Sequence, residues 1–156
     1  MAEVDEILSG WYAGEVGGNA LFSNLARGAV GERRAKWRAL ASVEAQVAVA
    51  LAAAMHARRI PVPVPPAESV DERARQRCAA IAGSSWLETM QWLHDLAAAA
   101  LVDMSSAAAR LPAPLAGIGD LVVRHEVALV AFADLELSGR SGGSLQPIAS
   151  FLDSMR

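Results

Sequence analysis

The spacing of helix-breaking residues is the feature of this sequence that most restricts its fold. Proline cannot donate a backbone hydrogen bond or continue a helix, and glycine weakens one. A glycine-containing turn at 28–31, a proline-rich run at 60–68 and the pair Pro112 and Pro114 are separated by long intervals. These intervals predict four helices of about twice the average length in globular proteins, at residues 4–28, 32–59, 86–111 and 115–138.

The composition also favours an all-α fold. Hydrophobic residues make up 53% of the chain and aromatic residues 5%, alanine is abundant, and the alternating apolar pattern of strands is almost absent. A chain of 156 residues can bury one substantial core without disulfides or a structural metal. We therefore expect a single domain, residues 1–156, built from closely packed helices.

The segment between the second and third long helices predicts how they connect. Residues 60–68, IPVPVPPAE, are expected to form polyproline II, and Ser69-x-x-Glu72 is expected to cap a short helix ending near residue 82. At ~3.1 Å per residue and then ~1.5 Å per residue, this connector spans roughly 45 Å, the length of a long helix. Such a crossover predicts a four-helix bundle made of two hairpins. The tail, residues 144–155, predicts a short C-terminal helix that closes one end.

Charge and cysteine content argue against several classes of protein. The net charge is −3, and the basic cluster Arg33, Arg34, Lys36 and Arg38 is local, so we expect no nucleic-acid partner. Cys78 is the only cysteine, which excludes an internal disulfide and suits a reducing cytoplasm. The acidic start MAEVDE differs from a secretory signal, and no 18-residue stretch lacks a charge. We therefore expect a cytoplasmic protein without a membrane-spanning segment.

One ionisable residue interrupts the apolar stripe of each predicted long helix near its middle. These residues are Glu15, Glu44, His94 and Glu126, and His125 lies on the flank of the fourth stripe. Apolar residues three and four positions apart mark the face of a helix that lies against the core. Because the interruptions occur at similar heights, we predict that they meet at one polar centre inside the bundle.

Two kinds of chemistry could stabilise such a centre. Carboxylates crowded in an apolar core repel one another, so they require cations or protonation. Iron or manganese ions bridged by the glutamates, with imidazoles completing the coordination, would form a centre able to bind and activate oxygen. Alternatively, His94, His125 and Arg124 could satisfy the glutamates in a hydrogen-bonded network without metal. The sequence alone leaves both open.

The helix lengths and the crossover resemble the ferritin-like superfamily, which includes rubrerythrins and di-iron carboxylate oxidases. The pattern of that superfamily is Glu on the first helix, Glu-x-x-His on the second, Glu on the third and Glu-x-x-His on the fourth. Glu15, Glu44 and Glu126 match the glutamates of the first, second and fourth helices. The resemblance implies a metal centre of the di-iron type, with iron or manganese as the cofactor.

The match to that pattern is incomplete. Val47 and Leu129 stand where the two motif histidines are expected. On the third helix, Glu88 has the position of a capping-box glutamate and is assigned a structural role. The resemblance therefore allows a site rearranged around His94 and His125, or a descendant that has lost its metal.

Two main functions follow from these patterns, and binding of a small organic ligand in the polar-lined core is a third. The first is a metal-dependent oxidoreductase or metal-handling protein with a small-molecule substrate that the sequence does not identify. The alternative is a non-catalytic bundle that acts through self-association or partner binding, because the alanine-rich faces of the second and fourth helices exceed what one small core can cover. We expect a homodimer in either case, and the sequence does not decide whether the protein is an enzyme.

Overall fold

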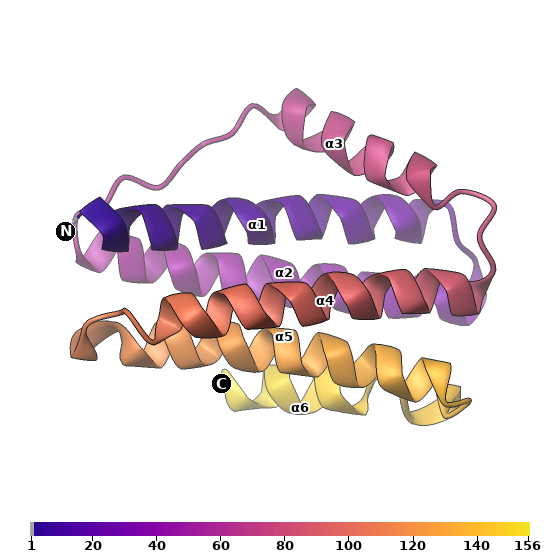
Figure 1. Cartoon of the computed structure of the whole chain (residues 1–156). Helices are drawn as coiled ribbons and strands as arrows, with labels where there is room; N and C mark the ends of the chain where they lie inside the picture. Colours follow the sequence, from indigo (N-terminus) through magenta and orange to yellow (C-terminus); the bar gives the residue numbers. More distant parts are fainter. Residues whose placement is uncertain (1) are drawn as a thin grey trace. The chain divides into compact units, whose positions relative to one another are not determined.

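Helices form all the regular secondary structure in the part of the chain that the computed structural model describes, residues 2–156. The predicted all-α fold is confirmed for these residues. The helices are α1 (Ala2–Arg27), α2 (Gly31–Ala57), α3 (Ala67–Ala80), α4 (Trp86–Ala108), α5 (Ala116–Leu137) and α6 (Gln146–Ser154), with 3-10 turns at Ala113–Leu115 and Ser141–Gly143 (Figure 1).

The chain divides into two compact units, residues 1–82 and 83–156. The first unit contains α1, α2 and α3, and the second contains α4, α5 and α6. Each unit holds one of the two long-helix pairs that the sequence predicts. The assembly of these pairs into one four-helix bundle, and the single domain 1–156, stay predictions.

In the first unit, α1 packs against α2 because only residues 28–30 join the two helices. Gly31 begins α2 with a φ of +58°, a left-handed conformation that glycine adopts without strain. Phe22 of α1 stacks on Trp37 of α2, with ring centroids 5.8 Å apart. Both helices contribute buried apolar residues, among them Leu8, Leu21, Leu40, Val43, Val47 and Leu51.

Helix α3 lies against α1 and follows a connector without regular secondary structure, residues 60–66. It begins directly after Pro66, and no side chain caps it. The predicted cap by Ser69 and Glu72 is therefore wrong, because the N-cap is Pro66, three residues earlier, and Ser69 lies inside the first turn. Glu72 instead accepts a hydrogen bond from Arg75 at 2.7 Å.

In the second unit, α4 packs against α5, and its start is the one that the sequence predicts. The Ser85 Oγ atom accepts a hydrogen bond from the Glu88 N–H at 3.2 Å, and the Glu88 carboxylate accepts one from the Ser85 N–H at 2.7 Å. This reciprocal capping box satisfies two backbone donors that the first helical turn leaves without partners. The structural role assigned to Glu88 is confirmed.

The remaining contacts of the second unit fix the two ends of α5. At its start, Gly119 permits close packing, since a Cβ atom there would lie 3.2 Å from the Ala108 Cβ atom. After its end, α6 packs back on α5 and buries Ile148 and Phe151. The predicted short C-terminal helix is confirmed.

Helix α2 contains an 18-residue window with a mean hydropathy of 1.4, of which 44% is buried. By length and composition alone, α2 is long and apolar enough to cross a membrane. One such helix is weak evidence for a membrane segment, because a core helix of a soluble protein passes the same test. The cytoplasmic location stays a prediction.

Candidate metal centre

In the first unit, two buried carboxylates occupy neighbouring positions on α1 and α2. Glu15 is 1% exposed and Glu44 is 5% exposed. The Glu44 carboxylate lies directly over Gly18, because a Cβ atom at Gly18 would be 2.7 Å from the Glu44 Cδ atom. Glu15 is three residues before Gly18 and therefore shares its face of α1. The absence of a side chain at Gly18 gives Glu44 the space it occupies.

In the second unit, two buried ionisable residues follow each other on α5. His125 is 0% exposed and Glu126 is 5% exposed. The His125 Nδ1 atom lies 3.8 Å from the Glu126 Oε1 atom. The His125 ring also contacts Phe151 of α6, with ring centroids 5.9 Å apart. His125, which the sequence places on the flank of the apolar stripe, is thus fully buried.

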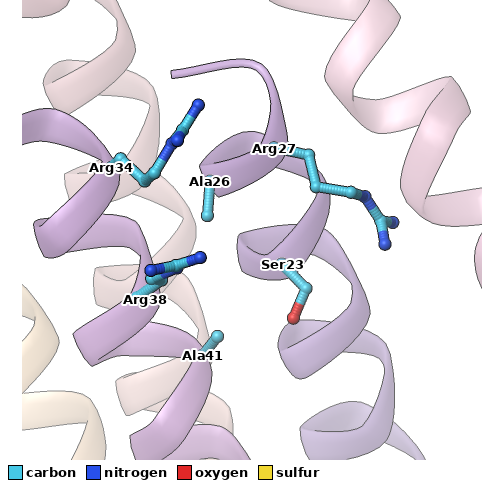
Figure 2. A pocket seen from close by; sticks show the side chains of 6 residues that line it. All are labelled: Ser23, Ala26, Arg27, Arg34, Arg38 and Ala41. Atoms are coloured by element: carbon cyan, nitrogen blue, oxygen red, sulfur yellow. The ribbon is translucent and has the colours of Figure 1, made fainter. Parts of the chain in front are cut away.

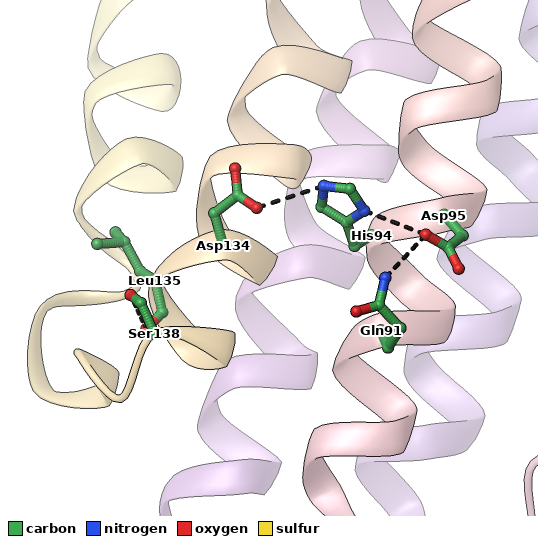
Figure 3. A network of polar contacts seen from close by, with 6 residues as sticks. All are labelled: Gln91, His94, Asp95, Asp134, Leu135 and Ser138. Atoms are coloured by element: carbon green, nitrogen blue, oxygen red, sulfur yellow. Dashed lines mark hydrogen bonds and ion pairs between the residues drawn. The ribbon is translucent and has the colours of Figure 1, made fainter.

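His94 lies in a different polar environment (Figure 3). Its side chain is 29% exposed, its Nδ1 atom is 3.2 Å from Asp95 Oδ1, and its Nε2 atom is 3.3 Å from Asp134 Oδ1. The hydrogen bond with His94 is the main reason why the pKa of Asp95 is lower than usual, and Gln91 adds to the effect. Both ring nitrogens therefore face carboxylates near the surface. The role of His94 in a metal centre stays a prediction.

The hydrogen-bonded alternative assigned Arg124 to the glutamates, and the structure gives Arg124 other partners. Its Nε atom donates to Asp120 at 2.8 Å, and its Nη1 atom donates to Ser154 at 2.8 Å. Its guanidinium carbon also lies 5.9 Å from the centre of the Phe151 ring. Arg124 therefore connects α5 to α6 at the surface and does not satisfy Glu126.

Sequence reasoning missed one buried carboxylate, Glu136, which is 2% exposed. It accepts hydrogen bonds from the Trp86 indole N–H at 2.7 Å and from the hydroxyls of Ser141 and Ser144 at 3.0 Å and 2.5 Å. These contacts tie the start of α4 and the turn after α5 to the end of α5. Its position in the sequence could have predicted this burial. Glu136 lies in the last turn of α5, where the helix dipole disfavours a carboxylate unless hydrogen-bond donors surround it.

The buried residues are of types that can bind transition metals. Carboxylate oxygens and imidazole nitrogens are ligands of iron, manganese and zinc. Glu15, His125 and Glu126 each offer one such atom from a buried side chain. Taken by itself, each unit buries two of the predicted ligands: Glu15 and Glu44 in the first unit, and His125 and Glu126 in the second.

The fold and these side chains define an all-α protein with buried candidate metal ligands. No protein-family model, no curated protein and no solved structure matches the chain. The ferritin-like resemblance therefore rests on helix lengths and glutamate positions, and it stays a prediction.

Proposed function

We propose that this protein binds a divalent transition metal, iron or manganese, through Glu15 and Glu44. The supporting observation is the close approach of the Glu44 carboxylate to Gly18, one helical turn from Glu15, with both glutamates buried. Two carboxylates in one apolar region are mutually repulsive when ionised, and a divalent cation removes that repulsion.

The ligand set of the proposed centre is larger than these two residues. Protein sites for iron, manganese and zinc usually have at least three protein ligands. The sequence pattern predicts His94, His125 and Glu126 as further ligands, and His125 and Glu126, the buried ones of the three, have their own variants in the test below. Their burial supports this choice. A centre of this kind is suited to metal handling or to oxidoreductase chemistry of the ferritin-like type.

Metal analysis of protein purified without chelator, and again after reconstitution with Fe²⁺, Mn²⁺ or Zn²⁺, tests the proposal. We expect stoichiometric metal and a melting temperature that rises with metal concentration, because a ligand of the native state alone stabilises it. Glu15→Gln and Glu44→Gln should each lower metal affinity by a factor of about ten or more, since each removes a charged ligand. His125→Gln and Glu126→Gln test the second unit in the same way.

Glu136→Gln is the matched control. Glu136 is as buried as the proposed ligands, but hydrogen bonds to Trp86, Ser141 and Ser144 account for its carboxylate. This variant should change stability and leave metal affinity unchanged. Absence of stoichiometric metal after reconstitution would reject the proposal, as would equal losses in Glu44→Gln and Glu136→Gln.

A second proposal is self-association through α2. Val49 is 70% exposed on this helix. Ala45, Ala52 and Ala53 lie three or four residues from it, on the same face, and none of the three is fully buried. An apolar surface of this kind favours contact with a second copy of the chain. The two proposals are compatible, because neither uses the residues of the other.

A further inference from the structure

A basic pocket lies in the first unit, next to the turn between α1 and α2 (Figure 2). Its volume is about 390 Å³, within the range of pockets that bind small molecules. Neither Glu15 nor Glu44 belongs to it. The residues that line it are Ser23, Ala26, Arg27, Arg34, Arg38 and Ala41.

Two arginines of α2 form its charged wall. Arg34 and Arg38 are four residues apart and share one face of the helix. Arg34 Nε donates a hydrogen bond to the Ala29 carbonyl oxygen at 2.6 Å, which fixes the guanidinium at the turn. Its two terminal nitrogens remain as donors for a ligand. Figure 2 shows the Arg38 guanidinium directed toward α1, across the pocket from Ser23 and Ala26.

These positive charges are not neutralised locally. In the part of the chain that the structure describes, no carboxylate forms an ion pair with Arg27, Arg34 or Arg38. Residues 23–41 contain five basic residues and a single acidic one, Glu32, although the whole chain has a net charge of −3. A pocket lined by guanidinium groups in an otherwise acidic protein attracts anions.

Arg27, the third arginine that lines the pocket, contributes less to ligand binding than Arg34 and Arg38. Arg27 extends from α1, and Figure 2 shows its guanidinium directed away from α2. It also lines a neighbouring groove that contains Asp71. Arg34, Arg38 and Ser23 are therefore the donors that face the pocket, and Arg27 adds positive charge at its rim.

We propose that this pocket binds a small organic phosphate. Guanidinium groups donate paired hydrogen bonds in a geometry that matches phosphate oxygens, and Ser23 adds a hydroxyl donor. The pocket is larger than a phosphate group requires, and Ala26 and Ala41 provide an apolar surface for the organic part. Of the basic side chains in residues 23–41, Arg34 and Arg38 face this pocket, and two guanidinium groups at one point suit a single phosphate group better than the repeated phosphates of a nucleic acid.

Titration calorimetry on the full chain, with inorganic phosphate and with glycerol 3-phosphate at one ionic strength, tests this proposal. We expect one site per chain, and tighter binding of the ester because its organic part contacts the alanines. Arg34→Gln and Arg38→Gln should each weaken binding of the ester about tenfold, since each removes a charge-assisted pair of hydrogen bonds.

Arg33→Gln is the matched control, because it removes the same charge from the same segment but does not line the pocket. Its affinity for the ester should stay within about twofold of the original. Equal losses in all three variants would overturn the proposal, because diffuse attraction would then explain the binding. The proposal would also be overturned if neither inorganic phosphate nor glycerol 3-phosphate bound. It would be overturned as well if a DNA duplex bound as tightly as glycerol 3-phosphate. The helical circular dichroism signal verifies that each variant is folded.

Discussion

At the scale of single residues, Gly18 is the position where one added carbon should affect the candidate centre. A Cβ atom there would collide with the Glu44 carboxylate. We expect Gly18→Ala to move that carboxylate and to lower metal affinity. The gain in helix propensity, about 0.5–1 kcal/mol, should be offset by the displacement of a buried charged group.

Gly17→Ala is the control for this prediction. No atom of the surrounding structure lies within 4 Å of a Cβ placed at Gly17, so this variant gains helix propensity without a collision. Urea denaturation should find Gly18→Ala less stable than Gly17→Ala by roughly 1–3 kcal/mol. If the two variants had equal stabilities and equal metal affinities, the position of the Glu44 carboxylate would not depend on the absence of a side chain at Gly18.

The residue pattern of the sequence predicted part of the candidate site. The helical period indicated that Glu15, Glu44 and Glu126 would be buried, and all three are. It also placed His94 in the polar centre, a role that stays a prediction, and it gave no indication of the contacts of His94 with Asp95 and Asp134 or of the burial of Glu136. His94 turns toward Asp134 of the neighbouring helix, and Glu136 is buried by donors that come from other segments. Such contacts depend on how helices pack, which a stripe along one helix does not encode.

At the scale of helices, the end of α2 contains local strain. Arg59 is the one non-glycine residue with a positive φ, 60°, among residues 2–156. The turn is closed by a hydrogen bond from the Ile60 N–H to the Met55 carbonyl oxygen at 2.9 Å, an arrangement in which glycine is usual. We expect Arg59→Gly to stabilise the protein by roughly 1 kcal/mol, because glycine adopts this conformation without strain.

Thermal unfolding of Arg59→Gly and of Arg58→Gly separates conformational strain from the loss of an arginine side chain. Arg58 has a φ of −102°, so glycine there only increases the entropy of the unfolded chain and should destabilise the protein. A lower melting temperature for Arg59→Gly than for the original chain would contradict the prediction.

The start of α4 should make stability depend on pH. Hydrogen bonds from the backbone N–H of Ser85, and also from its side chain, hold the pKa of Glu88 below the usual 4.5. A carboxyl group whose pKa is lower in the folded state stabilises that state above its unfolded pKa and loses this effect as the pH falls through the folded pKa. Denaturation at several pH values should find Glu88→Gln less stable than the original chain above pH 4.5, with a difference that shrinks at lower pH. A difference that does not change with pH would argue against the ionic part of the cap.

Helix boundaries were predicted best where local chemistry determines them. Ser85 and Glu88 form their capping box because both partners lie within one turn. Ser69 and Glu72 have the same spacing and do not form one, because Pro66 starts α3 earlier. The same motif therefore caps a helix only where no stronger start signal precedes it.

At the scale of the whole molecule, the sequence predicts two helix pairs and the structure has them, one in each unit. The packing of the two pairs into one bundle stays a prediction, because apolar surfaces rich in alanine can fit together in many registers when the small side chains have few distinguishing features. Patterning therefore indicates the two pairs better than their mutual packing. The metal-binding variants of both units test whether the pairs act together.

Self-association is the property of the whole molecule that the exposed face of α2 predicts. We expect a dimer at micromolar concentration by analytical ultracentrifugation. Val49→Glu should weaken that dimer by a factor of about ten or more, because burying an unpaired carboxylate in an apolar contact costs several kcal/mol. Val64→Glu is the control, since Val64 is 92% exposed but lies on the connector rather than on α2. A chain that sediments as a strict monomer would exclude self-association through α2, and equal weakening by both variants would place the contact elsewhere.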